Sequence, residues 1–178
     1  MSDMVLLAGI LILLPMTTPD PPQGKPNFTF GKQTYVHRYT KGNLLEFTPK
    51  AQSNLKKWTD MVSINDYPDA RDGDGLAGKA NAVLENYKAA KAVIVKTDSK
   101  PRTEKKPAEH LIVVLFPQPD FIEAAFARFV MNSGVGVSVV YSHRIYGKKA
   151  GDAMSKWLLQ NGEKYEKELM AMPSVPKH

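Results

Sequence analysis

Residues 34–48 read TYVHRYTKGNLLEFT and predict a β-hairpin. β-Branched and aromatic residues fill Thr34–Thr40, as is typical of a strand. Lys41-Gly42-Asn43 supplies a turn, and Leu44–Thr48 returns as a second strand that Pro49 ends. Strands joined by so short a turn pair antiparallel, so we expect the sheet of this chain to be largely antiparallel.

Further strands are expected later in the chain. Leu111–Phe116 is an uninterrupted apolar run, typical of a central strand that is buried on both faces. Ala92–Lys96 and the longer segment Val135–Tyr146 also have strand patterns. Met61–Ile64 fits either a strand or the end of a helix.

Four segments predict helices. Residues 75–90 and the segment from Asp120 to Ser133 carry apolar residues at helical spacing, with Asp74 as the expected cap of the first. A third helix is expected over 150–160, with a further turn toward Met170. The fourth is a short helix over residues 53–58.

The element order and the composition together predict the fold class. The 178 residues are 43% hydrophobic and 24% charged, which excludes a disordered chain and a polytopic membrane protein. We expect an α+β fold, a largely antiparallel β-sheet packed by three to four helices. It forms a single domain over residues 24–178.

The N-terminal segment predicts export. Met4–Met16 is an uncharged apolar run, shorter than the roughly 20 residues of a membrane span, and the Pro-rich stretch 17–24 follows it. Residues 1–23 therefore read as a signal-peptide-like or anchor segment of an exported bacterial-type protein, periplasmic or secreted. The leader Met1-Ser2-Asp3 has no Lys or Arg, and no small-x-small cleavage site is visible. A membrane tether made by a retained segment is the alternative.

Charge and cysteine content narrow the possible partners. The net charge is +6 and there is no cysteine, which excludes disulfides, thiolate nucleophiles and Cys-ligated zinc or iron–sulfur clusters. The basic balance favours a small anionic ligand or a protein partner. Nucleic acid is disfavoured, because the basic residues do not form one stripe. The basic segment 96–106 is expected to be an exposed loop that either aids solubility or contacts an anion or a partner.

Two predicted strands share a Tyr-x-His-Arg pattern. Side chains alternate along a strand, so each tyrosine lies on the same face as its histidine, and each arginine lies on the opposite face. If the strands are neighbours, the two imidazoles lie within about 10 Å of each other, and Glu46 of the hairpin could join them. The candidate ligand-binding residues are Tyr35, His37, Arg38, Glu46, Tyr141, His143 and Arg144. The alternative is that these side chains only cover a half-exposed sheet face.

These observations favour a non-catalytic binding or accessory protein for a small anionic ligand or a protein partner. The alternative is an exported enzyme that uses a His/Tyr/Glu cluster on the sheet for hydrolytic or acid/base chemistry. Phosphate-loop, dinucleotide-binding, serine-hydrolase and zinc-protease motifs are all missing from the sequence, and no cofactor is expected.

An acidic loop offers weak candidates for a metal site. Aligning Gly75 with the conserved glycine of an EF-hand loop places Ala70 and Asn81 where carboxylates are required, so an EF-hand is rejected. An irregular Ca²⁺ site and a solvated acidic turn remain as alternatives. The candidate ligands are Asp66, Asp69, Asp72 and Asp74.

Overall fold

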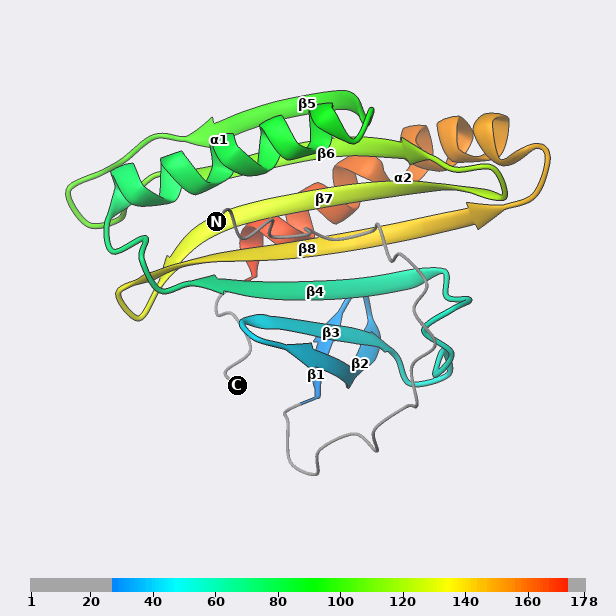
Figure 1. Cartoon of the computed structure of the whole chain (residues 1–178), viewed down its shortest axis with the longest axis horizontal. Coiled ribbons are helices and arrows are strands. Elements are labelled where there is room, and N and C mark those ends of the chain that lie inside the picture. The colour runs from blue at the N-terminus through cyan, green and yellow to red at the C-terminus, as the bar shows by residue number, and fades with distance from the viewer. Residues whose placement is uncertain (1–26, 173–178) are drawn as a thin grey trace.

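Residues 27–172, which a computed structural model describes, form one eight-stranded sheet and two helices. The strands are β1 (Phe28–Phe30), β2 (Gln33–Lys41), β3 (Leu44–Pro49), β4 (Asp60–Tyr67), β5 (Val93–Lys100), β6 (Glu109–Pro117), β7 (Phe121–Asn132) and β8 (Val135–Tyr146). The helices are α1 (Gly73–Ala89) and α2 (Ala150–Ala171). The strand order is β1-β2-β3-β4-β8-β7-β6-β5, and every neighbouring pair is antiparallel (Figure 1).

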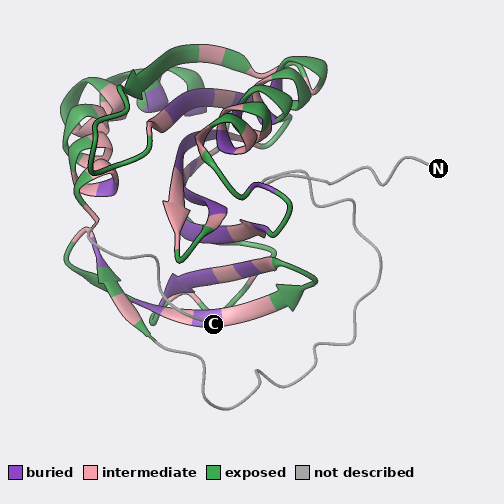
Figure 2. Ribbon diagram, turned by 90° about the vertical axis from the view of Figure 1, so that its left-hand side faces the viewer, coloured by how far each residue is buried: buried purple, intermediate pink, exposed green. Residues whose placement is uncertain are grey.

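The two helices cover opposite faces of the sheet. One core joins Leu169 of α2 to Val113 and Phe126. The other joins Leu76 of α1 to Val114, the next residue along β6. Because successive side chains of a strand point to opposite faces, β6, β7 and β8 are buried on both sides. Figure 2 shows buried residues along the strands and exposed residues on the outer sides of the helices.

The predicted hairpin and the first long helix are confirmed. β2 pairs with β3, with one irregularity between His37 and Tyr39. α1 buries Leu76, Ala80, Val83 and Tyr87, four of the residues predicted from helical spacing. Its cap differs from the expected one: Asp72 accepts a hydrogen bond from the backbone N–H of Gly75 at 2.8 Å, and Asp74 lies in the first turn.

The segment from Asp120 to Ser133 is strand β7, so the helix predicted there is wrong. Its apolar residues fall at helical spacing only because both faces of the strand are buried. Ala125 and Phe129 face α1, whereas Phe126 faces α2. An apolar residue is therefore required at nearly every position, and the alternation that identifies a half-buried strand disappears.

The expectation of three to four helices is consequently a second error in the fold class. Residues 53–58 form a short turn within irregular chain, and the last helix continues without a break from Ala150 to Ala171, so the described residues contain two helices. Met61–Ile64, which the sequence left undecided, belongs to β4.

Leu111–Phe116 is buried on both faces, as expected, but it is not central. It lies in β6, second from the edge of the sheet, and β4 and β8 occupy the middle. The reason is that α1 covers one face of β6 and the α2-side core covers the other, so burial does not require a central position.

The N-terminal segment 1–23 lies outside the described residues. Within residues 27–172, neither helix is both long enough and apolar enough to cross a membrane.

Substitutions of one buried and one exposed valine should distinguish the core from the sheet edge by their effect on stability. Val114 has 0% exposure and Val95 on β5 has 49%. Val114→Asp buries an unpaired charge and should cost on the order of 3 kcal/mol or more, whereas Val95→Asp should change stability by under about 1 kcal/mol. Urea unfolding of both variants measures the difference. Equal, small losses would contradict the burial of β6 on both faces.

Candidate functional site

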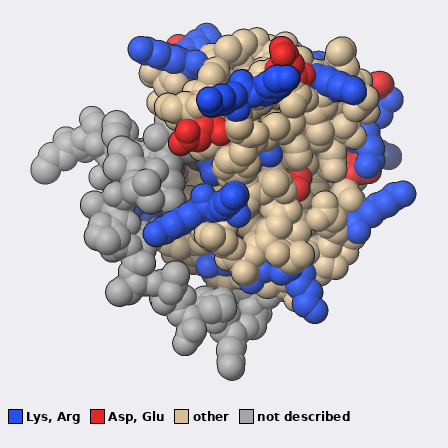
Figure 3. All heavy atoms as spheres, turned by 90° about the vertical axis from the view of Figure 1, so that its right-hand side faces the viewer, with Lys and Arg blue, Asp and Glu red and all other residues tan. Residues whose placement is uncertain are grey.

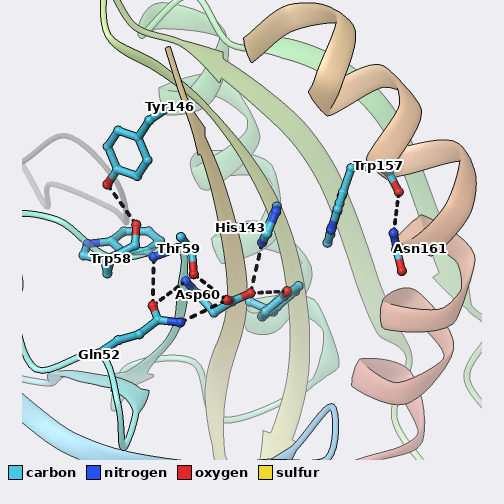
Figure 4. Close-up of polar contacts among 9 residues, drawn as sticks. Gln52, Trp58, Thr59, Asp60, His143, Tyr146, Trp157 and Asn161 are labelled. Carbon is cyan, nitrogen blue, oxygen red and sulfur yellow. Dashed lines mark hydrogen bonds and ion pairs between the residues drawn. The ribbon is translucent and has the colours of Figure 1, made fainter. Parts of the chain in front are cut away.

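A polar cluster lies where β4 begins, on the sheet face that α2 covers. Asp60 stands directly opposite His143 in the β4–β8 pairing, and Tyr141 lies two residues earlier on the same face. The Tyr141 hydroxyl donates to Oδ1 of Asp60 at 2.8 Å, and Nδ1 of His143 lies 3.0 Å from the same oxygen (Figure 4). Because a carboxylate only accepts, Nδ1 of His143 carries the proton in this contact.

The other carboxylate oxygen of Asp60 holds the loop that precedes β4. It accepts hydrogen bonds from Thr59 Oγ1 at 2.8 Å and from Gln52 Nε2 at 3.2 Å. Gln52 Oε1 in turn accepts from the backbone N–H groups of Thr59 and Asp60 at 2.8 and 3.0 Å. Asp60 therefore accepts four hydrogen bonds and holds residues 50–59 against the sheet.

Two opposing effects act on the acidity of Asp60. Burial raises its pKa, but the hydrogen bonds from His143, Tyr141 and Thr59 together outweigh burial and hold the pKa below its ordinary value. For Tyr141, burial and the neighbouring Asp60 carboxylate raise the pKa. The pair is therefore a carboxylate beside a neutral phenol, which is a stable structural arrangement.

Aromatic side chains of α2 hold the other side of the cluster. The His143 and Trp157 rings stack 4.0 Å apart at 7°, and Trp157 stacks on Tyr165 at 5.5 Å. Tyr165 stacks in turn on Tyr141 at 4.5 Å. Stacking on Trp157 thus fixes the plane of the His143 imidazole, and the contact with Asp60 fixes the rotation of the ring within that plane.

The structure does not bring the two predicted histidines onto neighbouring strands, so that expectation is wrong. His37 and Tyr35 lie on β2, and β3 and β4 separate β2 from the strand that carries His143. Nε2 of His37 lies 2.8 Å from Thr40 Oγ1, and its ring packs edge-on against Phe47. Tyr35 belongs to the same core as Tyr141. A shared sequence pattern carries no information on strand order, which is why the prediction failed.

The predicted arginines use their donors on the protein itself. Arg38 donates to Thr48 Oγ1 at 3.0 Å and to the carbonyl of Lys50 at 3.1 Å. Arg144 donates to Glu123 Oε2 at 2.8 Å. The Arg144 guanidinium also lies over the rings of Trp58, at 3.8 Å, and Phe121, at 4.3 Å. These cation–π contacts and the buried ion pair hold the end of β8 in place.

Glu46 lies on the opposite face from His143 and does not join the histidine. It is half-buried on β3. Burial and the neighbouring charge of Glu123 raise its pKa to about 7, against the opposing effect of Arg144. Oε1 of Glu123 and the hydroxyl of Tyr87 are buried without a hydrogen-bond partner among the described residues.

The four acidic candidates are dispersed. Asp66 lies in β4, Asp69 pairs with Lys79 at 2.6 Å, Asp72 caps α1 and Asp74 is exposed in the first turn. Over residues 27–172, no three His, Cys, Asp or Glu side chains are arranged to hold a metal ion.

A lysine-rich surface occupies the same end of the sheet as the Asp60 cluster. We call it the lysine end, and it comprises Lys50, Lys56, Lys57, Lys148 and Lys149. All five are exposed, and none forms an ion pair within the described part of the chain. Figure 3, which faces this end, shows Lys and Arg side chains around an area of mostly uncharged atoms. Asp120 and Asp152 contribute exposed carboxylates there.

Sequence reasoning missed Asp60, Gln52, Trp157 and the lysine end. The lysines come from two segments about 90 residues apart, and only the pairing of β4 with β8 brings the segments together. Trp157 and Tyr165 are eight residues apart on α2, but the sequence predicted that this helix ends near residue 160, so their common face was not predicted. The strand that they face was not predicted either.

Comparisons with known proteins find likeness in structure alone. No protein family and no curated protein matches the sequence. The chain is similar to the Ran-binding protein Mog1p of Saccharomyces cerevisiae, at 8% identity and a TM-score of 0.45 over 83% of this chain and 94% of that one. A mutant of the protein Mog1 gives 6% identity and a TM-score of 0.46 over 83% and 93%. Human STARD10 gives 9% identity and 0.32 over 78% and 74%. TM-scores below 0.5 do not establish a shared fold.

The Asp60 cluster predicts a loss of stability at low pH. A carboxylate whose folded-state pKa is depressed stabilises the fold above its unfolded pKa of about 3.9, and that contribution is lost as the pH falls through the folded value. Asp60→Asn should therefore lower the free energy of unfolding by about 2–4 kcal/mol at pH 7. The gap between variant and wild type should shrink below about pH 4. Urea unfolding at several pH values measures it, with exposed Asp120→Asn as the control. A gap that does not change with pH would contradict the ionised Asp60.

The raised pKa of Glu46 predicts that its contribution to stability depends on pH in the opposite sense to that of Asp60. Its pKa is raised from 4.5 to about 7 on folding, so ionising it disfavours the fold, and stability falls as the pH rises across that interval. Glu46→Gln should be more stable than wild type at pH 8 and lose this advantage toward pH 5. Thermal unfolding at both values measures the effect, and Glu104→Gln on the exposed loop serves as the control. An equal advantage at pH 5 and pH 8 would show that Glu46 is not perturbed.

Proposed function

We propose that this chain is an exported, non-catalytic binding protein that docks its lysine end on an acidic surface of a protein partner. The observation that carries the proposal is the set of five exposed lysines that lack ion pairs within residues 27–172. An excess of five exposed lysines over the carboxylates of Asp120 and Asp152 at one end steers an acidic partner and sets its orientation.

The backbone beneath these lysines is ordered before any partner binds. The Tyr146 hydroxyl donates to the carbonyl of Trp58 at 2.8 Å, and the N–H of Arg144 donates to the carbonyl of Thr59 at 2.8 Å. These bonds join the two lysine-bearing segments to each other, and Trp58 is buried. A surface that is already ordered loses less entropy on binding, so more of the electrostatic attraction remains as affinity.

A protein surface fits this end better than a small anion does. A small-anion site needs donors that converge on one point, and guanidinium groups are the side chains best suited to it. Arg38 and Arg144, the two arginines among the candidate ligand-binding residues, already donate to other groups of the protein. The lysines, by contrast, are spread over two segments, which matches a wide acidic face.

Export is the second part of the proposal. It rests on the apolar run Met4–Met16 and the Pro-rich stretch that follows it. Fractionation of the source cells should find the protein outside the cytoplasm, with an N-terminus between about Thr17 and Lys25. A cytoplasmic protein that keeps Met1 would contradict export and leave the binding proposal standing.

An enzyme that uses His143 is the second candidate. The observation in its favour is the Asp60–His143 contact, because a carboxylate that orients Nδ1 leaves Nε2 as a proton acceptor. The rest of the expected cluster is not assembled: His37 lies three strands away and Glu46 lies on the other face. His143→Gln tests this candidate, since a binding protein keeps its partner affinity and an acid/base enzyme loses its turnover.

Charge reversal tests the lysine end. The chain carries three adjacent lysine pairs, Lys56-Lys57, Lys148-Lys149 and Lys105-Lys106, of which the last lies between β5 and β6 at the other end of the sheet. A carbodiimide joins lysines to carboxylates that they touch, so cross-linking in source-cell extract should connect residues 50–57 and 148–149 to acidic peptides of one other protein. Changing the first two pairs to Glu should abolish these links, and changing Lys105-Lys106 should not.

Three outcomes would overturn the proposal. One is cross-linking that occurs equally at all three lysine pairs. Another is links that survive reversal of the first two pairs. The third is binding of the wild type to duplex DNA or to phosphatidylglycerol vesicles without any protein partner.

A further inference from the structure

We propose that β5 accepts an extended, acidic segment of the partner protein as an additional strand. This inference rests on the proposed binding function and names the second element that the partner contacts. β5 is the last strand in the sheet order and pairs only with β6. From Lys96 to Lys100, beyond an irregularity between Ile94 and Lys96, every second residue of this edge strand therefore points its backbone N–H and C=O away from the sheet, where another strand can bind them.

β5 also exposes apolar side chains. Of its eight residues only Ile94 is partly buried, and Val93 and Val95 are 53% and 49% exposed. The third large exposed hydrophobic residue of the described chain is Leu159 on α2, at 90%. An edge of this length with exposed valines is a template for strand addition.

Leu159 lies on the flank of α2 that carries Glu166. Lys96 of β5 pairs with Glu166 of α2 at 2.6 Å, which fixes the two elements side by side. Leu159 lies two helical turns before Glu166 on the same helix face, about 10 Å along the axis. Val93 lies a similar distance before Lys96, on the same side of the sheet, since its partner Leu115 alternates with the Lys96 partner Val113. Val93 and Leu159 thus expose apolar side chains toward the start of β5 and on the α2 flank that carries Glu166.

A hollow continues this surface at the other end of β5. It has a volume of about 380 Å³ and is lined by the end of β5 and the last turns of α2, with Leu111 and Met170 among its walls. An extended segment on β5 places alternate side chains toward α2. Apolar residues of such a segment would meet Val93 and then Leu111 and Met170 in the hollow, whose rim also carries charged side chains of β5 and α2.

Charge selects the segment that binds. Lys91 lies two residues before β5, Lys156 lies three residues before Leu159, and neither forms an ion pair within residues 27–172. β5 also carries Asp98, and Lys96 already pairs with Asp98 and with Glu166. The positive charge without an ion pair at this edge therefore comes from Lys91 and Lys156, and it favours an acidic strand of another protein as the occupant.

A designed peptide tests this inference on the full chain. The probe is a fluorescein-labelled eight-residue peptide that alternates glutamate with valine, and its matched control alternates lysine with valine. Fluorescence anisotropy should show saturable binding of the first peptide and none of the second. The double variant Val93→Thr, Leu159→Ser should weaken binding at least tenfold, and both positions are exposed, so the fold should persist. Lys91→Glu with Lys156→Glu should also weaken it.

Hydrogen exchange locates the bound peptide. Strand addition should slow exchange of alternate backbone amides of β5, whereas a peptide held only by charge should leave them unprotected. Absence of binding, equal binding of both peptides, binding without protection of β5, or dimers of the chain paired through β5 would each overturn the inference.

The proposal for the lysine end and the proposal for β5 can be refuted independently of each other. The Lys56-Lys57 to Glu variant should keep its affinity for the peptide, because these lysines lie away from β5. Cross-links at the lysine end together with no peptide binding would refute the β5 site alone. Peptide binding on β5 without cross-links at the lysine end would refute the lysine end alone.

Discussion

The two helices pack on opposite faces of β7 and β8, and the other features of the structure follow from this constraint. α1 contacts β6, β7 and β8 from one side, and α2 contacts β7 and β8 from the other. Water is excluded from both faces, so these strands carry apolar residues at nearly every position. A charge on them needs a partner, because an unpaired buried charge costs several kcal/mol. Arg144 has Glu123, and Arg128 has Glu109 together with the carbonyls of Leu169 and Met172 at the end of α2.

The same constraint explains which elements the sequence could predict. β2 and β3 have one face toward the α2-side core and a short turn between them, so their pattern was readable. α1 lies on the surface and buries one stripe, so its helical period was visible. β7 has two buried faces and several alanines, and its pattern is that of an apolar helix. Burial on both sides removes the periodic signal on which sequence reasoning depends.

The candidate site was less predictable than the fold, for a physical reason. Tyr141 and His143 were found because they lie on one face of a readable strand. Their partner Asp60 was not found, because it belongs to β4, whose position depends on pairing with β8 across about 75 residues of chain. The order of strands in a sheet is a property of the whole fold, so a local sequence pattern does not predict it. His37 illustrates this, because the same Tyr-x-His-Arg pattern on β2 places its histidine among other residues than those around His143.

The internal polar groups and the surface lysines have different roles. Asp60 has four donors, Arg144 has a carboxylate and two aromatic rings, and Arg38 has a hydroxyl and a carbonyl. Groups so fully used hold loops in place, and a ligand would have to displace existing bonds to reach them. Ordering a backbone residue costs roughly 1–2 kcal/mol, so the loop of residues 50–59, already bonded to β4 and β8, presents its lysines without that loss on binding. The polar interior and the lysine end are therefore connected: the first orders the segments that carry the second.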